Sequence, residues 1–285
     1  SFSSAGNEGN LNDGTASVWE GDFVDGGANA LIPGGTVNNF GSGNLNDQIT
    51  TAGARSLLFW SDPLGASSND YDLFVLNSAA TAVVASSTNI QDGNDDPVEA
   101  AGNRTSGQRL VILKKRGAAA RFLHLTSFGA EMAIVTTGTT HGHNHALNAF
   151  SVAATPAAAT PFGGPAGPFP NPFNSGNKVE TFSSDGPRRL LYNANSTPIT
   201  PGNVSSTGGV LRQKPDITAA DGVSCAAAGF STFFGTSAAA PYAGAIPALE
   251  RWLGQSLPGP LSLRRLAAGR LGLPSGPGLQ GPASA

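Results

Sequence analysis

The residues best suited to chemistry lie near the end of the chain, in the stretch STFFGTSAAAPYAGA (231–245). Ser237 follows Gly-Thr and precedes three alanines and Pro241, so we predict a glycine-permitted turn that enters a helix at Ser237. The free N–H groups and positive dipole end of a helix N-terminus favour oxyanion character. A hydroxyl is still a weak nucleophile until a base takes its proton. Ser237 is therefore a candidate nucleophile that needs a basic partner.

The start of the chain offers a candidate donor for the oxyanion that such a nucleophile would create. In SSAGNEG (3–9), Asn7 stands on a glycine-flanked turn after a short strand-like run. A side-chain amide there can donate a hydrogen bond to a developing oxyanion, and one such donor typically changes the rate by about 10²–10³.

Histidines are the first place to look for a base or a metal ligand. HGHNH contains His141, His143 and His145, which would share one face of a strand, and imidazole suits zinc or copper. No fourth ligand with suitable spacing is evident, so we favour a loop or strand-edge cluster with ordinary hydrogen bonds. His124 lies in the alternating stretch RFLHLTS (121–127), and we expect it on the solvent face.

Oxygen-rich turns raise the question of calcium. QDGNDDPVE (91–99) alternates oxygen side chains, but Pro97 and Asn103 stand where a helical calcium loop needs Gly and Glu. The turn SSNDYDL, with Asp70 and Asp72, could bind calcium in a looser site or form turns closed by its own side chains. We assign no metal ligand and no cofactor, and leave calcium open.

The elements that must position these residues separate into four segments. We predict an inserted antiparallel β-sandwich over 16–135, because short β-type runs alternate there with Asp-Pro, Asn-Asp and Asp-Gly turns. Residues 1–15 and 136–253 would form the domain that the sandwich interrupts, and 254–285 a low-complexity, disordered tail. The β-type runs are RSLLFWS (55–61), YDLFVLN (71–77), TAVVASS (81–87), RLVILKK (109–115), RFLHLTS (121–127) and EMAIVTT (131–137).

Composition excludes several classes of function. The net charge of −3 provides no field for nucleic acid or an anionic membrane, and no apolar run reaches the length of a membrane span. One cysteine, Cys225, excludes an internal disulfide framework, and we expect it to be a small buried residue. Charged residues make up only 12%, and Gly, Ser, Thr and Asn replace them, which favours a secreted protein.

Five motifs occur in the order found in subtilisin-like serine proteases, the subtilases, and on these residues the chain resembles that family. The motifs are SAGNEG, ALNAFSVAAT, VETFSSDGPRR, KPDITAADGV and FFGTSAAAPYAGA. They cover residues 1–9 and 147–249.

The resemblance implies a fold and a set of roles. The fold would be α/β, an incomplete subtilisin-like parallel-sheet domain interrupted by the β-sandwich. Ser237 would be the nucleophile, Asn7 and the Ser237 N–H would hold the oxyanion, and Ala5 and Gly6 would border the first substrate pocket. In the family, the catalytic Asp and His precede the oxyanion Asn, so HGHNH stands in the wrong place for the base. The chain would then begin downstream of both residues and be inactive by itself.

Two departures from the family affect these expectations. The sandwich is inserted close to the oxyanion Asn, so we expect it to border the substrate cleft. Pro247 lies ten residues into the helix that starts at Ser237, where it should kink or end that helix.

Two functions remain. The first is a serine endopeptidase that cleaves polypeptides through an acyl-enzyme. The second is a non-catalytic binding module with a vestigial protease scaffold and a ligand-binding sandwich. The intact Gly-Thr-Ser and Gly-Asn pairs favour the first. A lipase-like elbow is excluded, because Ala239 stands where that motif needs glycine.

Overall fold

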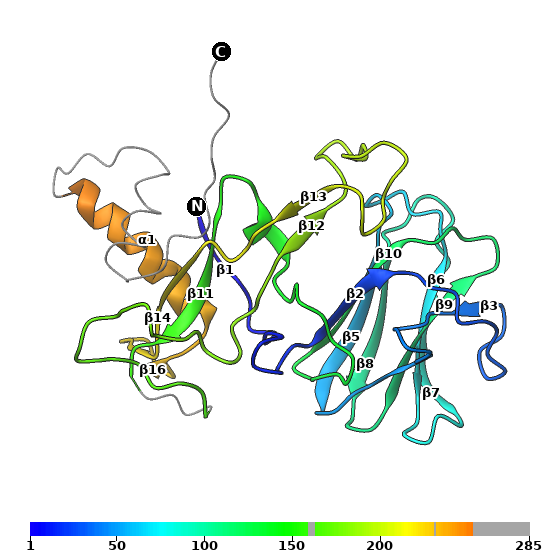
Figure 1. Ribbon diagram of the computed structural model, residues 1–285, viewed down its shortest axis with the longest axis horizontal. Coiled ribbons are helices and arrows are strands. Elements are labelled where there is room, and N and C mark those ends of the chain that lie inside the picture. Colours follow the sequence, from blue (N-terminus) through cyan, green and yellow to red (C-terminus); the bar gives the residue numbers. More distant parts are fainter. Residues whose placement is uncertain (159–162, 231, 253–285) are drawn as a thin grey trace, which may run out of the picture. The chain divides into compact units, whose positions relative to one another are not determined.

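The computed structural model describes residues 1–158, 163–230 and 232–252 (Figure 1). The chain divides into two compact units, and each is described here by itself. The first unit comprises residues 1–7, 142–183 and the chain from 215 onward, and the second comprises 8–141 and 184–214. The regular elements of the described residues are mostly β-strands, with one α-helix, and the strands form one parallel sheet and several antiparallel sheets.

A three-stranded parallel sheet is the centre of the first unit. Its order is β1 (Phe2–Ser4), β11 (Phe150–Pro156) and β14 (Ile217–Asp221). Phe2 lies opposite Phe150, and Val152 lies opposite Ile217. Because the strands are parallel, their carboxyl ends lie at one edge of the sheet. Asn7 and Asp221 therefore belong to the same edge.

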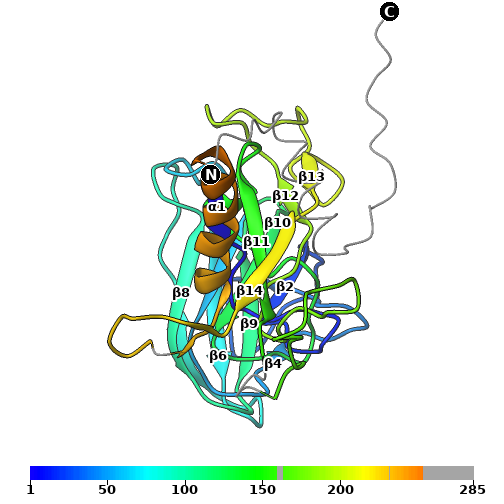
Figure 2. The same ribbon diagram turned by 90° about the vertical axis from the view of Figure 1, so that its left-hand side faces the viewer.

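The helix α1 (Thr236–Trp252) packs against this sheet (Figures 1 and 2). Ala239, Ala240 and Ala243 are buried against Val152 and Ala154 of β11, and small residues let the helix approach the sheet closely. Of the two effects predicted for Pro247, a kink or an end of the helix, the second is not observed, since α1 continues to Trp252. Proline removes a single N–H donor, and the alanine and leucine beside it are strong helix formers.

Three short elements complete the first unit. They are the 3₁₀ turn η1 (Gly142–His145) and the antiparallel pair β15 (Val223–Ser224) and β16 (Thr232–Phe233). Cys225 follows β15 and is only half-buried, so the expectation of a buried residue is not met. The predicted tail over 254–285 lies outside the described residues.

Two antiparallel sheets pack face to face in the second unit. One sheet has the order β2 (Val18–Asp22), β10 (Phe122–Phe128), β5 (Gly53–Trp60) and β8 (Val98–Arg104). The other has the order β3 (Gly35–Val37), β9 (Arg109–Lys115), β6 (Tyr71–Leu76) and β7 (Val83–Ser87), and β4 (Asp47–Gln48) also pairs with β9. A further antiparallel pair is β12 (Arg188–Leu190) with β13 (Val210–Arg212).

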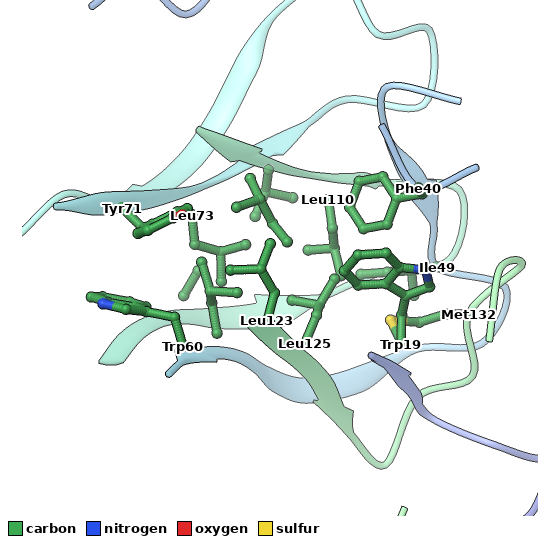
Figure 3. Packing of buried hydrophobic residues seen from close by; sticks show 14 of the residues in the cluster. Trp19, Phe40, Ile49, Trp60, Tyr71, Leu73, Leu110, Leu123, Leu125 and Met132 are labelled. Atoms are coloured by element: carbon green, nitrogen blue, oxygen red, sulfur yellow. The ribbon is translucent and has the colours of Figure 1, made fainter. Parts of the chain in front are cut away.

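The space between the two large sheets is filled by apolar side chains from both (Figure 3). Leu58, Leu123 and Leu125 come from one sheet, Leu73 and Leu110 from the other, and all five are fully buried. Burial of a leucine side chain contributes about 1.5–3 kcal/mol, so this layer is a main source of stability for the unit.

The observed bounds differ from the predicted segments in two places. EMAIVTT (131–137) is not a strand: it forms only an isolated bridge between Met132 and Ile49. Its backbone instead bonds to several strands in turn, including Val18 O, which accepts from Thr136 N–H. The second unit also begins at Glu8 and includes 184–214, a stretch whose turn-rich sequence carries little strand signal.

Asp185 ties the two ends of the long segment 8–141 together within the second unit. Its carboxylate accepts hydrogen bonds from the Leu11 N–H (3.0 Å) and the Gly138 N–H (2.9 Å). Thr139 Oγ1 donates directly to Gly9 O at 2.6 Å. The place where the chain enters this unit is therefore hydrogen-bonded to the place where it leaves.

Candidate active site

Ser237 stands in the first turn of α1 and is exposed, whereas its neighbours Thr236 and Ala238 are buried. Gly235 precedes the helix with φ +112°, a conformation that side chains rarely adopt. Its carbonyl accepts the first helical hydrogen bonds, from the N–H groups of Ala238 (2.9 Å) and Ala239 (3.2 Å). The glycine thus turns the chain so that Ser237 enters the helix with its side chain facing outward.

Asn7 is bound to the same turn through Thr236. Asn7 Oδ1 accepts hydrogen bonds from the Thr236 N–H (3.0 Å) and from Thr236 Oγ1 (2.9 Å). Thr236 Oγ1 in turn accepts from the Gly6 N–H at 3.2 Å. The structure therefore brings the two candidate residues from opposite ends of the chain to one place.

This arrangement leaves two N–H donors without an acceptor among the described residues. Two donors hold the oxygen of the Asn7 amide, so its Nδ2 is the group that remains, and it lies near Gly235. Within residues 1–158, 163–230 and 232–252, no group accepts from Asn7 Nδ2 or from the Ser237 N–H. Preorganised N–H donors beside a serine hydroxyl are the kind of group that can stabilise an oxyanion.

Ala5 and Gly6 hold the strand end that presents Asn7. Ala5 is buried, its N–H donates to Val152 O at 2.9 Å, and its carbonyl accepts from Asn144 Nδ2 at 3.2 Å. Asn144 also donates to Ser4 O at 2.9 Å. Both backbone groups of Ala5 are therefore hydrogen-bonded within the first unit, and they fix the strand end that leads to Asn7.

Three polar residues of this site were not found from the sequence. Asn144, Thr236 and Asp221 are buried, and each fixes backbone close to Asn7 or Ser237. Thr236 is part of the Gly-Thr-Ser motif, which was the available signal. Asn144 and Asp221 carry no local signal, because their partners are distant in the sequence.

A base for Ser237 is not among its contacts. In the part of the chain that the structure describes, no histidine or carboxylate is hydrogen-bonded to Ser237. HGHNH is a 3₁₀ turn rather than a strand, with His143 exposed and His145 buried, while His141 belongs to the second unit. The arrangement of three histidines on one strand face is therefore not formed.

His124 is buried, so the expectation of a solvent-facing side chain is wrong. Its Nδ1 lies 2.6 Å from Glu20 Oε1 and 2.9 Å from Arg188 Nη1, and Arg188 also bonds Glu20. The strand β10 is central in its sheet, and Glu20 and Arg188 cover the face that alternation assigns to solvent. All three residues belong to the second unit.

The three side chains form a charged cluster whose pKa values are displaced. Burial lowers the pKa of His124 to about 4, with a further contribution from the positive charge of Arg188, so the ring is neutral near pH 7. Burial raises the pKa of Glu20, but hydrogen bonds and charge from His124 and Arg188 outweigh it, so its pKa lies below the usual value. The cluster is best explained as an internal ion pair that attaches β12 to the sandwich.

Metal ligands do not gather in the described residues. Among them, no group of three or more His, Cys, Asp and Glu side chains has the geometry to hold a metal ion. Asp72 is buried and pairs with Lys115 Nζ at 3.4 Å, and burial raises the pKa values of Asp70 and Asp72.

No described helix is long and apolar enough to cross a membrane.

Comparison with known proteins adds no assignment. No protein-family model matches the sequence, and no curated protein matches it.

Proposed function

We propose that Ser237 is the nucleophile of a subtilisin-like serine endopeptidase, with Asn7 Nδ2 and the Ser237 N–H as the oxyanion hole. The observation that carries this proposal is the hydrogen bonding of Asn7 Oδ1 to Thr236, which leaves Asn7 Nδ2 without an acceptor among the described residues, beside the exposed Ser237. The carboxyl ends of the parallel strands and the N-terminus of α1 meet at this place, as in many sites of α/β proteins.

The mechanism follows from these positions. Ser237 Oγ attacks a peptide carbonyl, and its proton passes to a base. The carbonyl oxygen becomes negative and accepts from Asn7 Nδ2 and the Ser237 N–H. Collapse of this intermediate expels the amine and leaves an acyl-enzyme, which water hydrolyses. Ala5 and Gly6 would border the pocket for the residue before the cleaved bond, and extracellular polypeptides are the proposed substrates.

The proposal requires an imidazole base, so the test is made both on the 285-residue chain and on the polypeptide that its gene encodes. A fluorophosphonate probe should label Ser237 in the encoded polypeptide, as located by mass spectrometry, and casein should be cleaved. The 285-residue chain by itself should show negligible cleavage, since no histidine is hydrogen-bonded to Ser237 in its described part, and without a base only the help of the oxyanion hole and binding acts.

Two variants and one control make the test specific. Ser237→Ala should abolish labelling and cleavage, and Asn7→Ala should lower kcat by about 10²–10³ with little change in KM. Ser224→Ala, at an exposed serine of the same unit, should leave both unchanged. An encoded polypeptide that folds but shows no labelling of Ser237 would refute the endopeptidase and leave the binding-module alternative.

A further inference from the structure

The stretch HGHNH draws attention through its histidines, but its most buried residue is Asn144. This asparagine lies in η1 and is only 3% exposed. Its Nδ2 donates to Ser4 O at 2.9 Å and to Ala5 O at 3.2 Å. An amide nitrogen carries two hydrogens, so one side chain can hold both carbonyls at the same time. The two carbonyl oxygens belong to the end of β1 and the residue after it.

The end of β1 needs this donor because the strand leaves β11 at Ala5. The ladder includes a hydrogen bond from the Phe150 N–H to Ser1 O at 2.9 Å. Continued by four residues along both parallel strands, the same pattern would bring the Ala154 N–H to Ala5 O. The Ala154 N–H donates instead to Ser183 Oγ at 3.1 Å. Ala5 O therefore loses its donor from the sheet, and the side-chain amide of η1 supplies another.

Only Gly6 separates this strand end from Asn7. Gly6 has φ +118°, and its N–H donates to Thr236 Oγ1 at 3.2 Å. The Asn7 side chain is held by Thr236 as well. Asn7 is thus fixed from two sides, by Thr236 and by the backbone of Ala5. Glycine resists rotation little, so without the hold on Ala5 the chain could turn at Gly6 and carry Asn7 with it.

We infer that Asn144 is a positioning residue of the oxyanion site, because its amide fixes the end of β1 and thereby the place of Asn7 Nδ2. It acts through the backbone of Ser4 and Ala5 rather than on the reacting atoms. A displacement of about 1 Å can lower a rate by about 10²-fold, so this hold should matter to kcat. The positioning role rests on the proposed function, whereas the two hydrogen bonds from Asn144 do not depend on it.

The first measurement is hydrogen exchange, followed by NMR on the full 285-residue chain, and it needs no catalysis. In wild type, the side-chain amide of Asn144 should exchange at least about 100-fold more slowly than that of Asn171, an exposed asparagine of the same unit. Asn144→Leu and Asn144→Asp both lack the donor. In each, the Gly6 N–H should exchange about tenfold or more faster, while the Ala154 N–H keeps its rate. Equal exchange of the two wild-type side chains, or an unchanged Gly6 rate in both variants, would overturn the inference.

The second measurement is a double-mutant cycle on casein cleavage by the polypeptide that the gene encodes. Asn144→Leu and Asn144→Asp should each lower kcat by about tenfold or more with little change in KM, whereas the control Asn171→Leu should change neither. In an Asn7→Ala background, the Asn144 substitutions should have almost no further effect on kcat, because the group that Asn144 positions is gone.

The cycle separates positioning from a general loss of structure. If both Asn144 variants keep the wild-type kcat, or lower it by the same factor with and without Asn7, the positioning role is wrong. If wild type does not cleave casein, the proposed function fails, while the exchange rates still decide whether Asn144 holds the end of β1.

Discussion

The Asp47 carboxyl offers a sharp test of how burial shapes the stability of the sandwich. Asp47 has no exposed surface, and its Oδ1 accepts from the Ile134 N–H at 2.9 Å. Its Oδ2 has no hydrogen-bond partner in the described part of the chain. Burial raises the pKa of Asp47 from 3.8 to about 7, so the carboxyl is mostly protonated below neutral pH in the folded state.

The direction of the pH dependence follows from this shift. The folded state holds the proton more tightly than the unfolded state, so the free energy of unfolding falls as pH rises from about 4 to about 7. A shift of about three pH units at 1.36 kcal/mol each amounts to about 4 kcal/mol at alkaline pH. Asp47→Asn removes this dependence but leaves two buried amide N–H groups unpaired where protonated Asp47 has one O–H, which costs about 1–3 kcal/mol at every pH.

Wild type should therefore be the more stable protein near pH 4, and Asp47→Asn near pH 8. The difference between them should change by about 4 kcal/mol across that range. Urea unfolding of the full chain, followed by the fluorescence of the core residues Trp19 and Trp60, measures it. Asp92→Asn, at an exposed aspartate of the same unit, is the control. A difference between Asp47→Asn and wild type that stays constant with pH would refute the reasoning.

Three further predictions concern single side chains. The pKa of His124 is lowered from 6.5 to about 4 in the folded protein, so the free energy of unfolding of wild type should fall by up to about 3 kcal/mol as pH falls from about 6.5 to 4. Urea unfolding of His124→Asn should not show this decrease. Gly235→Ala should lower the free energy of unfolding by about 1–3 kcal/mol in thermal unfolding, because Gly235 has a positive φ and an added Cβ would lie 3.3 Å from Asn7 Nδ2. The control Gly102→Ala should change it little, because nothing lies within 4 Å of an added Cβ there. Leu123→Ala should cost about 2–5 kcal/mol in urea unfolding, and Leu64→Ala, at a residue that is 76% exposed, should cost almost nothing.

Local patterns predicted the elements better than the contacts. Runs such as RLVILKK and YDLFVLN became β9 and β6, because β-branched and aromatic residues fill the two sides of a packed sheet. The stretch EMAIVTT is also rich in β-branched residues, but it forms no ladder with any one strand. Composition describes what a strand can bury, and the choice of a neighbour depends on the rest of the sheet.

The candidate site shows the same difference between what local sequence predicts and what it does not. Ser237 and Asn7 were found because each carries a short glycine-containing motif of its own. Thr236 joins them across 229 positions, and Asn144 reaches Ser4 across 140, so no window of sequence contains both partners. The alternation of polar and apolar residues along a single strand predicts that His124 faces solvent. It cannot show that Glu20 and Arg188, which belong to two other elements, cover this side chain. Buried polar networks of this kind are visible only in three dimensions.

The contact between Gly9 and Thr139 bears on the order in which the protein folds. Phe2 and Phe150 pair in the parallel sheet, so closing that pair in an open chain means closing a loop of well over a hundred residues. Once the second unit has folded, Thr139 Oγ1 and Gly9 O are 2.6 Å apart, and the effective loop shrinks to about 18 residues, seven from Phe2 to Gly9 and eleven from Thr139 to Phe150. The logarithmic dependence of closure entropy on length makes this worth about 2 kcal/mol. We therefore expect the sandwich to fold early, and its folding to make the pairing of β1 with β11 easier. A unit whose entry and exit points lie side by side can therefore be inserted between two strands of another sheet without greatly slowing the pairing of those strands.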